Sequence, residues 1–154
     1  MFNHKPKDYI CPFCLLVKGV ENEHVYTRQN EIIYKNRSLT AFVSSHGWPN
    51  NKGIVIIVPN EHYENIYEVP ESILKQIAVL SKKIALTIKK VYGCDGVSIR
   101  QHNEPAGNQD TWHYHYQIIP RYLNDKLYQN HDLKKMLDPK ERKIFAEKLK
   151  RQMS

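Results

Sequence analysis

The sequence lacks any long hydrophobic run, and its longest apolar stretch covers only residues 54–59. A helix that spans a bilayer needs about 20 apolar residues. The N-terminal segment, MFNHKPKDYI, has no apolar core of the kind found in signal peptides. Cysteine is also scarce. The chain has three cysteines, and this small, odd number does not suit a disulfide scaffold. We therefore expect no membrane span and no secretion by a signal peptide, and we predict a cytoplasmic location.

The remaining composition is that of a globular protein, with 41% hydrophobic and 25% charged residues in a chain of 154. No internal repeat, low-complexity block or flexible linker divides the chain. We predict one domain over residues 1–154, with its core at about residues 10–122 and a C-terminal extension, residues 123–154, that carries a helix.

Charge is unbalanced toward the basic side, since 23 Lys and Arg face 16 Asp and Glu, a net charge of +7. A basic protein favours anionic partners such as nucleotides, phosphates or nucleic acid. The same excess is equally compatible with mere solubility, because much of it lies in KKIALTIKK and in the lysine-rich tail. Only one aromatic residue, Phe145, lies among the lysines of the last predicted helix, so a nucleic-acid arm is the less favoured interpretation.

The order of predicted elements indicates an α+β fold with an antiparallel sheet. A long helix follows Pro70, where apolar residues recur at steps of three and four up to Val91, and it ends near Gly93. A last helix begins with Asp138 as its N-cap and Pro139 as its first residue. Strands are expected at residues 23–26, 31–34, 39–43, 53–59, 96–101 and 112–120, because these runs are β-branched, aromatic or continuously apolar.

The last predicted strand carries the most informative side chains. On a strand, alternate residues share a face, so His113, His115 and Gln117 point to the same side. Two imidazoles and an amide would then form a polar strip beside aromatic neighbours. The spacing alone is also compatible with a half-exposed strand that carries incidental histidines.

Four segments together resemble the histidine-triad (HIT) family, in family order over about residues 10–121. The segment from His113 to Arg121, HYHYQIIPR, is similar to the HIT motif with Gln in the third place. IVIIVPNEHYENIYE resembles the strand, proline and following histidine of bacterial members, and AGNQDTWHYH resembles their approach to the triad. CPFC matches the Cys-x-x-Cys of the zinc-containing bacterial branch. The resemblance implies the HIT fold, with one long helix and a C-terminal helix on the sheet.

The resemblance implies a nucleotidyl hydrolase or transferase that acts at the α-phosphate of a nucleotide. His115 would be the nucleophile and form a covalent nucleotidyl-histidine, which suits imidazole because it is largely neutral and nucleophilic at pH 7. Gln117 stands where hydrolases have a third histidine, as in the galactose-1-phosphate uridylyltransferase branch, which transfers to phosphate acceptors. Gln109 and Asn103 match positions that contact phosphate, and Asp110 stands where many members have Ser.

The nucleoside end departs from the family pattern. Ser44 falls where many HIT hydrolases have an acidic residue that holds the ribose hydroxyls, and a hydroxyl makes a weaker pair with a diol than a carboxylate does. Trp48, on the loop that follows, would stack on a base or simply pack locally. The base therefore stays open.

The same resemblance implies a structural zinc ion held by Cys11, Cys14, His62 and His113. Four N and S ligands satisfy tetrahedral zinc and leave no position open for substrate. Two alternatives remain for the cysteines. Cys-Pro-Phe-Cys is also similar to the redox motif of glutaredoxins, although Gly19 follows too soon for the long helix that such a motif needs. The two residues could also be unliganded thiols.

These inferences lead to one main hypothesis and two rivals. The main one is an enzyme that acts on a dinucleoside polyphosphate, a nucleoside phosphoramidate or a nucleotide sugar, and that forms a homodimer as family members usually do. The second is a non-catalytic nucleotide-binding or signalling module in which Gln117 and Ser44 mark lost chemistry. The third is nucleic-acid end processing of the aprataxin kind, which rests on charge alone.

Overall fold

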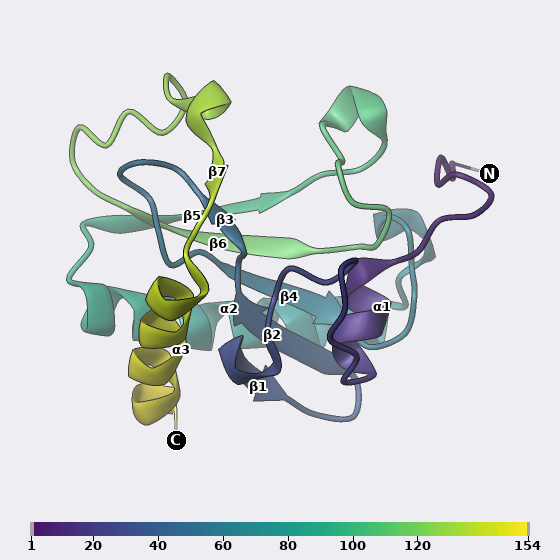
Figure 1. Cartoon of the computed structure of the whole chain (residues 1–154), viewed down its shortest axis with the longest axis horizontal. Coiled ribbons are helices and arrows are strands. Elements are labelled where there is room, and N and C mark those ends of the chain that lie inside the picture. Colours follow the sequence, from purple (N-terminus) through teal and green to yellow (C-terminus); the bar gives the residue numbers. More distant parts are fainter. Residues whose placement is uncertain (1, 154) are drawn as a thin grey trace.

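The computed structural model describes residues 2–153, and its centre is a five-stranded antiparallel sheet (Figure 1). The strand order is β1-β2-β4-β6-β5. Strand β6 therefore lies between β4 and β5 and pairs with both. The strands of this sheet are β1 (Ile32–Lys35), β2 (Leu39–Val43), β4 (Val55–Pro59), β5 (Gly96–Gln101) and β6 (Tyr116–Arg121). The predicted α+β class with an antiparallel sheet is confirmed.

One face of the sheet is covered by the long helix α2 (Glu71–Tyr92), which lies behind the sheet in Figure 1. The C-terminal helix α3 (Pro139–Met153) packs beside α2 and against β1. The core between these layers contains Ile77, Ile84 and Ile88 of α2 and alternate residues of the strands, among them Val55 and Ile57 of β4. Burial of this apolar surface is the main favourable term in folding.

The opposite face is covered by the short helix α1 (Pro12–Val17) and the segment after it. Leu16 and Val25 pack there against Phe42 of β2 and against Ile56 and Val58 of β4. The period of two along β4 thus divides its continuous apolar run between the two cores. Shorter elements complete the chain: β3 (His46–Gly47), β7 (Lys135–Met136) and the 3₁₀ turns Gln29–Glu31, Ile66–Glu68, Pro105–Gly107 and His131–Leu133.

The helix boundaries follow the predicted signals closely. Pro70 lies one residue outside α2 as its N-cap, and its carbonyl accepts hydrogen bonds from Ile73 N and Leu74 N. Gly93 ends α2 in the left-handed conformation, at a φ of 63°, which costs glycine nothing because it has no Cβ. Asp138 caps α3, since its Oδ1 accepts from Lys140 N at 2.7 Å.

Two strand predictions are wrong. Residues 23–26 form a turn, and Val25 is buried against the sheet by tertiary packing with no strand partner. Strand β6 begins at Tyr116, so residues 112–115 of the predicted strand lie outside the ladder. The chain leaves the ladder there because His113 N turns back to Thr111 O and Tyr114 N bonds Tyr63 O beyond the end of β4.

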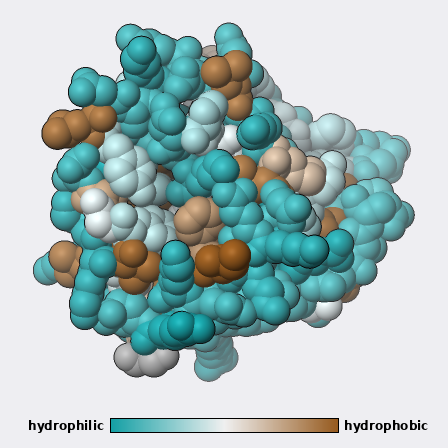
Figure 2. All heavy atoms as spheres, turned by 60° about the vertical axis from the view of Figure 1, so that its left-hand side comes forward, coloured by the Kyte–Doolittle hydropathy of each residue, from teal (hydrophilic) through white to brown (hydrophobic). Residues whose placement is uncertain are grey.

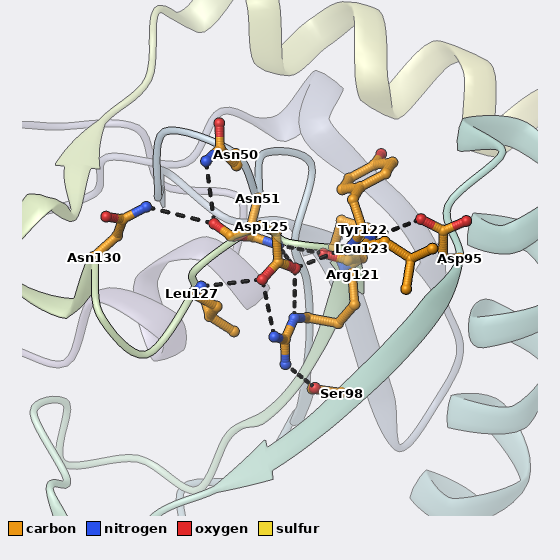
Figure 3. Close-up of polar contacts among 11 residues, drawn as sticks. Asn50, Asn51, Asp95, Ser98, Arg121, Tyr122, Leu123, Asp125, Leu127 and Asn130 are labelled. Atoms are coloured by element: carbon orange, nitrogen blue, oxygen red, sulfur yellow. Dashed lines mark hydrogen bonds and ion pairs between the residues drawn. The ribbon is translucent and has the colours of Figure 1, made fainter.

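A buried carboxylate holds the turn that follows β6 (Figure 3). Asp125 accepts from Arg121 Nε at 2.7 Å and Nη2 at 2.9 Å, from Asn51 Nδ2 at 2.7 Å, and from Tyr122 N and Leu127 N at 3.0 Å each. Arg121 also donates to Ser98 Oγ. The Arg121 side chain is therefore committed to a structural contact that fixes the path of the C-terminal extension.

The surface is mainly hydrophilic on the face shown in Figure 2, where hydrophobic side chains occur in small separate groups. Among the described residues, no helix combines the length and the apolar character needed to cross a bilayer.

Candidate active site and metal centre

His115 lies just before β6 and is buried, with 4% of its surface exposed. Its Nδ1 donates a hydrogen bond of 2.8 Å to the backbone carbonyl of His113. A carbonyl can only accept, so the proton sits on Nδ1 and the lone pair of Nε2 is left free. Burial lowers the pKa of His115, which keeps the ring neutral. The geometry therefore presents a neutral imidazole nitrogen as a nucleophile.

His115 lies in the wall of a cavity of about 380 Å³, the size of a small-molecule site. The cavity is polar around His115, where Gln117, Asp110, Thr111 and Lys134 also line it. Its other walls are largely apolar and come mainly from α1, the segment after it and the face of β2 and β4 that they cover. The apolar lining residues are Pro12, Phe13, Leu16, Val25, Phe42, Trp48, Ile54 and Ile56.

Gln117 and Ser44 both line this cavity, so the structure brings these two predicted site residues together with His115. Gln117 lies opposite Ile56 in the register of β4 and β6, which places both side chains on the cavity side of the sheet. Ser44 follows β2, and its Oγ accepts from His46 N at 3.3 Å. Trp48 lines the cavity too, but it is 3% exposed and its Nε1 donates to His131 O, so it is packed into the fold.

Asn103 and Gln109 do not line the cavity. Gln109 is buried, its Nε2 donates to Glu64 O and Thr111 O, and its Oε1 accepts from Glu104 N at 2.8 Å. Glu104 has a φ of 62° and a ψ of 164°, a region that only glycine normally visits. Asn103 bonds Gln101 at the start of the same loop and accepts from Ile66 N in the turn before α2. Both amides thus hold the strained loop that leads to Asp110.

Among the lining residues that the sequence-based site did not include, Asp110, Lys134 and Phe13 matter most for His115. Asp110 Oδ1 lies 3.8 Å from His115 Nε2, and Asp110 Oδ2 lies 3.3 Å from the ammonium of Lys134. Phe13 packs edge-on against the His115 ring, with centroids 5.5 Å apart. Asp110 was noted only as a departure from the family serine. For Phe13 the available signal was its place inside the Cys-x-x-Cys motif.

The four predicted metal ligands converge next to the cavity. One ligand atom each of Cys11, Cys14, His62 and His113 lies within 4.8 Å of the others. The separations of sulfur and nitrogen are 3.3 Å for Cys11 Sγ and His113 Nδ1, 3.3 Å for Cys14 Sγ and His62 Nδ1, and 3.5 Å for Cys14 Sγ and His113 Nδ1. Tetrahedral zinc, with bonds of about 2.3 Å to S and about 2.0–2.1 Å to N, sets such atoms about 3.6 Å apart.

The protonation pattern of His113 also fits a metal. Its Nε2 donates to the carbonyl of Pro59 at 3.0 Å, so the lone pair of Nδ1 points at the two sulfurs. The pKa of the Cys14 thiol is lowered by the hydrogen bond from Cys11 and by the rings of His113 and His62. A thiolate and an imidazole lone pair are the forms that bind zinc. The donor set fits a closed structural site.

Comparison with known proteins agrees with this description. A family model of the HIT domain matches residues 27–124. An uncharacterised HIT-like protein of Saccharolobus solfataricus is 30% identical over 116 residues, which cover 75% of this chain and 77% of that protein. Adenylylsulfatase HINT3 of Arabidopsis thaliana is 26% identical over 125 residues, 81% of this chain and 59% of that protein. A zinc-bound histidine triad family protein from Mycobacterium smegmatis has a TM-score of 0.74 at 22% identity, covering 93% of this chain and 92% of that chain.

The fold and the site thus define an α+β protein in which a buried histidine faces a cavity beside a Cys₂His₂ cluster. The chain belongs to the HIT family, as the four sequence segments predicted.

Proposed function

We propose that this protein is a nucleotide hydrolase or nucleotidyltransferase that acts at the α-phosphate through His115. The observation that carries the proposal is the hydrogen bond from His115 Nδ1 to His113 O, which leaves Nε2 free at the cavity. The likeness to a plant adenylylsulfatase, an enzyme of nucleotide chemistry by its name, supports it.

In the proposed reaction, the Nε2 lone pair attacks the α-phosphorus, and the bond from phosphorus to the leaving group breaks with its electron pair. The product is a nucleotidyl-histidine, and an acceptor then displaces the ring nitrogen and restores the neutral imidazole. Gln117 lines the cavity beside His115, and its Nε2 would donate a hydrogen bond to a non-bridging oxygen of the phosphoryl group. An amide is a poor proton donor, so Gln117 would be a poor general acid in this reaction. We therefore propose transfer to an acceptor such as inorganic phosphate.

The nucleoside would bind in the apolar part of the cavity, against the wall that Phe13, Leu16, Phe42 and Ile56 line. Ser44 is the polar group available for the ribose there. We further propose that Asn103 and Gln109 act on phosphate through the loop that they hold, because their polar atoms are engaged in hydrogen bonds within that loop and to Glu64 and Ile66.

Zinc is the metal that we propose for the cluster of Cys11, Cys14, His62 and His113, in a structural role. A closed four-ligand site ties the N-terminal segment to the sheet and supplies no open coordination position to substrate. We keep the cytoplasm as the proposed compartment, where thiols stay reduced and available to a metal.

A homodimer is the proposed assembly. β5 is an edge of the sheet, and Ile99 on it is exposed, as are Val79 and Leu86 of α2. An unpaired edge strand with apolar side chains is a natural surface for a second copy. Light scattering during gel filtration should give about twice the chain mass, and a mass of one chain would contradict the dimer.

Phosphorus NMR tests the proposed reaction directly. A dinucleoside tetraphosphate and a nucleoside phosphoramidate are incubated with wild type and with His115→Ala, with and without inorganic phosphate. Turnover that requires phosphate and disappears in the variant is the expected result. Turnover in water alone, also lost in the variant, would assign a hydrolase. Nucleotide binding that survives His115→Ala, with no turnover by wild type, would instead favour a non-catalytic binding module.

A further inference from the structure

The C-terminal extension reaches the cavity through a small second sheet. β7 pairs antiparallel with β3, with Met136 opposite His46, and the two lie side by side in Figure 1. Leu137 is buried and its N donates to Ser45 O, while Trp48 Nε1 donates to His131 O on the other side of β7. This segment is therefore fixed at both ends over the cavity wall, and Lys134 lies between the two fixed points.

Lys134 is joined to the nucleophile through a single carboxylate. Its ammonium lies 3.3 Å from Asp110 Oδ2, and Asp110 Oδ1 lies 3.8 Å from His115 Nε2. The carboxylate thus spans the space between the nucleophilic nitrogen and the lysine, with one oxygen toward each. Burial raises the pKa of Asp110, but the nearby Lys134 ammonium opposes it, and the pKa lies below its ordinary value.

A substrate phosphoryl group needs the space that Asp110 now fills. Attack requires phosphorus at about 3–3.5 Å from Nε2, with the leaving group on the side opposite the nitrogen. The Asp110 oxygen stands only slightly farther from Nε2 than that. The other oxygen of the same carboxylate lies 3.3 Å from the Lys134 ammonium. A phosphoryl group in place of the carboxylate would therefore bring its leaving group within reach of Lys134.

We propose that Lys134 binds the anionic leaving group of the substrate, and that Asp110 is its counter-ion while the site holds no substrate. This rests on the proposed function and narrows its substrate class. Nucleotides whose leaving group carries its own negative charge, such as the polyphosphate of a dinucleoside polyphosphate, gain an ion pair with Lys134. Phosphoramidates, whose leaving group is an amine, gain nothing from it.

Kinetics with the two substrate types distinguishes binding of the leaving group from an effect of Lys134 on activity toward every substrate. Lys134→Met removes the ammonium, which also lies 5.6 Å from the centre of the Trp48 ring, and keeps an unbranched side chain, whereas Lys134→Arg restores the charge. Lys135→Met, at the next position of β7, is the matched control. A charge-assisted contact is worth about 10- to 100-fold in affinity. We expect Lys134→Met to lower kcat/KM by that factor for the dinucleoside tetraphosphate and by less than about threefold for the phosphoramidate, with recovery in Lys134→Arg and no change in Lys135→Met.

Equal losses on both substrates, or a loss on neither, would overturn the assignment of Lys134. A binding measurement keeps the test independent of turnover: inorganic tripolyphosphate is titrated by calorimetry into wild type and variants. Lys134→Met should weaken binding about tenfold or more, whereas Asp110→Asn should strengthen it, because the competing carboxylate charge is gone. Unchanged binding in Lys134→Met, or weaker binding in Asp110→Asn, would contradict the proposal that an anion replaces Asp110 as the partner of Lys134. If wild type turns over neither substrate, the proposed function fails, and the titration alone decides the anion site.

Discussion

Replacement of Asp125 by Asn should destabilise the fold strongly although it changes one atom. The carboxylate is 2% exposed and accepts five hydrogen bonds (Figure 3), two of them from the Arg121 guanidinium. An amide can accept at its oxygen only, and its NH₂ group would face donors that now bond the second carboxylate oxygen. The variant would therefore leave Arg121 without its counter-ion and at least one buried donor without an acceptor.

Breaking a buried charge pair by removing one partner costs about 3–5 kcal/mol. That is a large part of the roughly 5–15 kcal/mol by which a domain is stable. For a chain of this size, each kcal/mol lowers Tm by about 2–4 °C, so Asp125→Asn should lower Tm by about 6–20 °C. Urea unfolding at pH 7 measures the change, as a lower midpoint with an unchanged slope.

The matched control is Asp132→Asn, since this carboxylate is fully exposed and pairs only with the neighbouring His131 at 3.4 Å. Its effect should stay within about 0.5 kcal/mol. A loss below about 1 kcal/mol in Asp125→Asn would refute the reasoning, because the hydrogen bonds to the carboxylate would then contribute little.

The pH dependence of stability gives an independent check of the same carboxylate. Hydrogen bonds from Arg121, and then from Asn51 and the backbone, hold the pKa of Asp125 well below its usual range. A folded pKa below the unfolded one means that the contribution is complete above the unfolded value of about 3.9 and is lost as pH falls toward the folded pKa. The stability difference between wild type and Asp125→Asn should therefore be constant from pH 7 to about pH 5 and shrink below about pH 4.

Three further predictions concern the metal, the cavity and the C-terminal helix. Cys14→Ser should reduce bound zinc from about one ion per chain, measured by elemental mass spectrometry, to a small fraction, and wild type without zinc would contradict the metal assignment. Phe13→Ala should lower kcat/KM about 10- to 100-fold, because the ring sets the position of His115, whereas a wild-type rate would exclude this role. Arg142→Met should cost about 3–5 kcal/mol because it leaves Glu31 buried and unpaired, and adding Glu31→Leu should recover most of the loss; equal instability of the single and double variants would disprove the pairing argument.

The sheet and the long helices were predictable because their signals are local. The apolar run of β4, the stripe of α2 and the caps at Pro70, Gly93 and Asp138 depend only on near neighbours in the chain. Residues 112–115 carry an equally good strand pattern, yet they leave the ladder. The local preference is overridden there by two hydrogen bonds, from Tyr114 N to Tyr63 O after β4 and from the His113 ring to Pro59 O.

The site was predictable as far as a motif or a resemblance extended. His115, Gln117 and Ser44 line one cavity, and the four cysteine and histidine ligands converge beside it. Lys134 had no local signal, because it lies just before a strand of only two residues and is one of many lysines in a basic tail. Its place follows from pairing with β3 far back in the chain.

His113 belongs to the proposed metal site and also orients His115, the proposed nucleophile. Its Nδ1 faces the two cysteine sulfurs, its Nε2 donates to Pro59 O, and its own carbonyl accepts from His115 Nδ1. A metal bound to this cluster would therefore fix the carbonyl that selects the tautomer of His115. A change that frees His113 from the cluster would let this carbonyl move and His115 turn with it. Loss of zinc should thus lower the rate of the chemical step even at temperatures where the fold persists, although no metal ligand lies in the wall where substrate would bind.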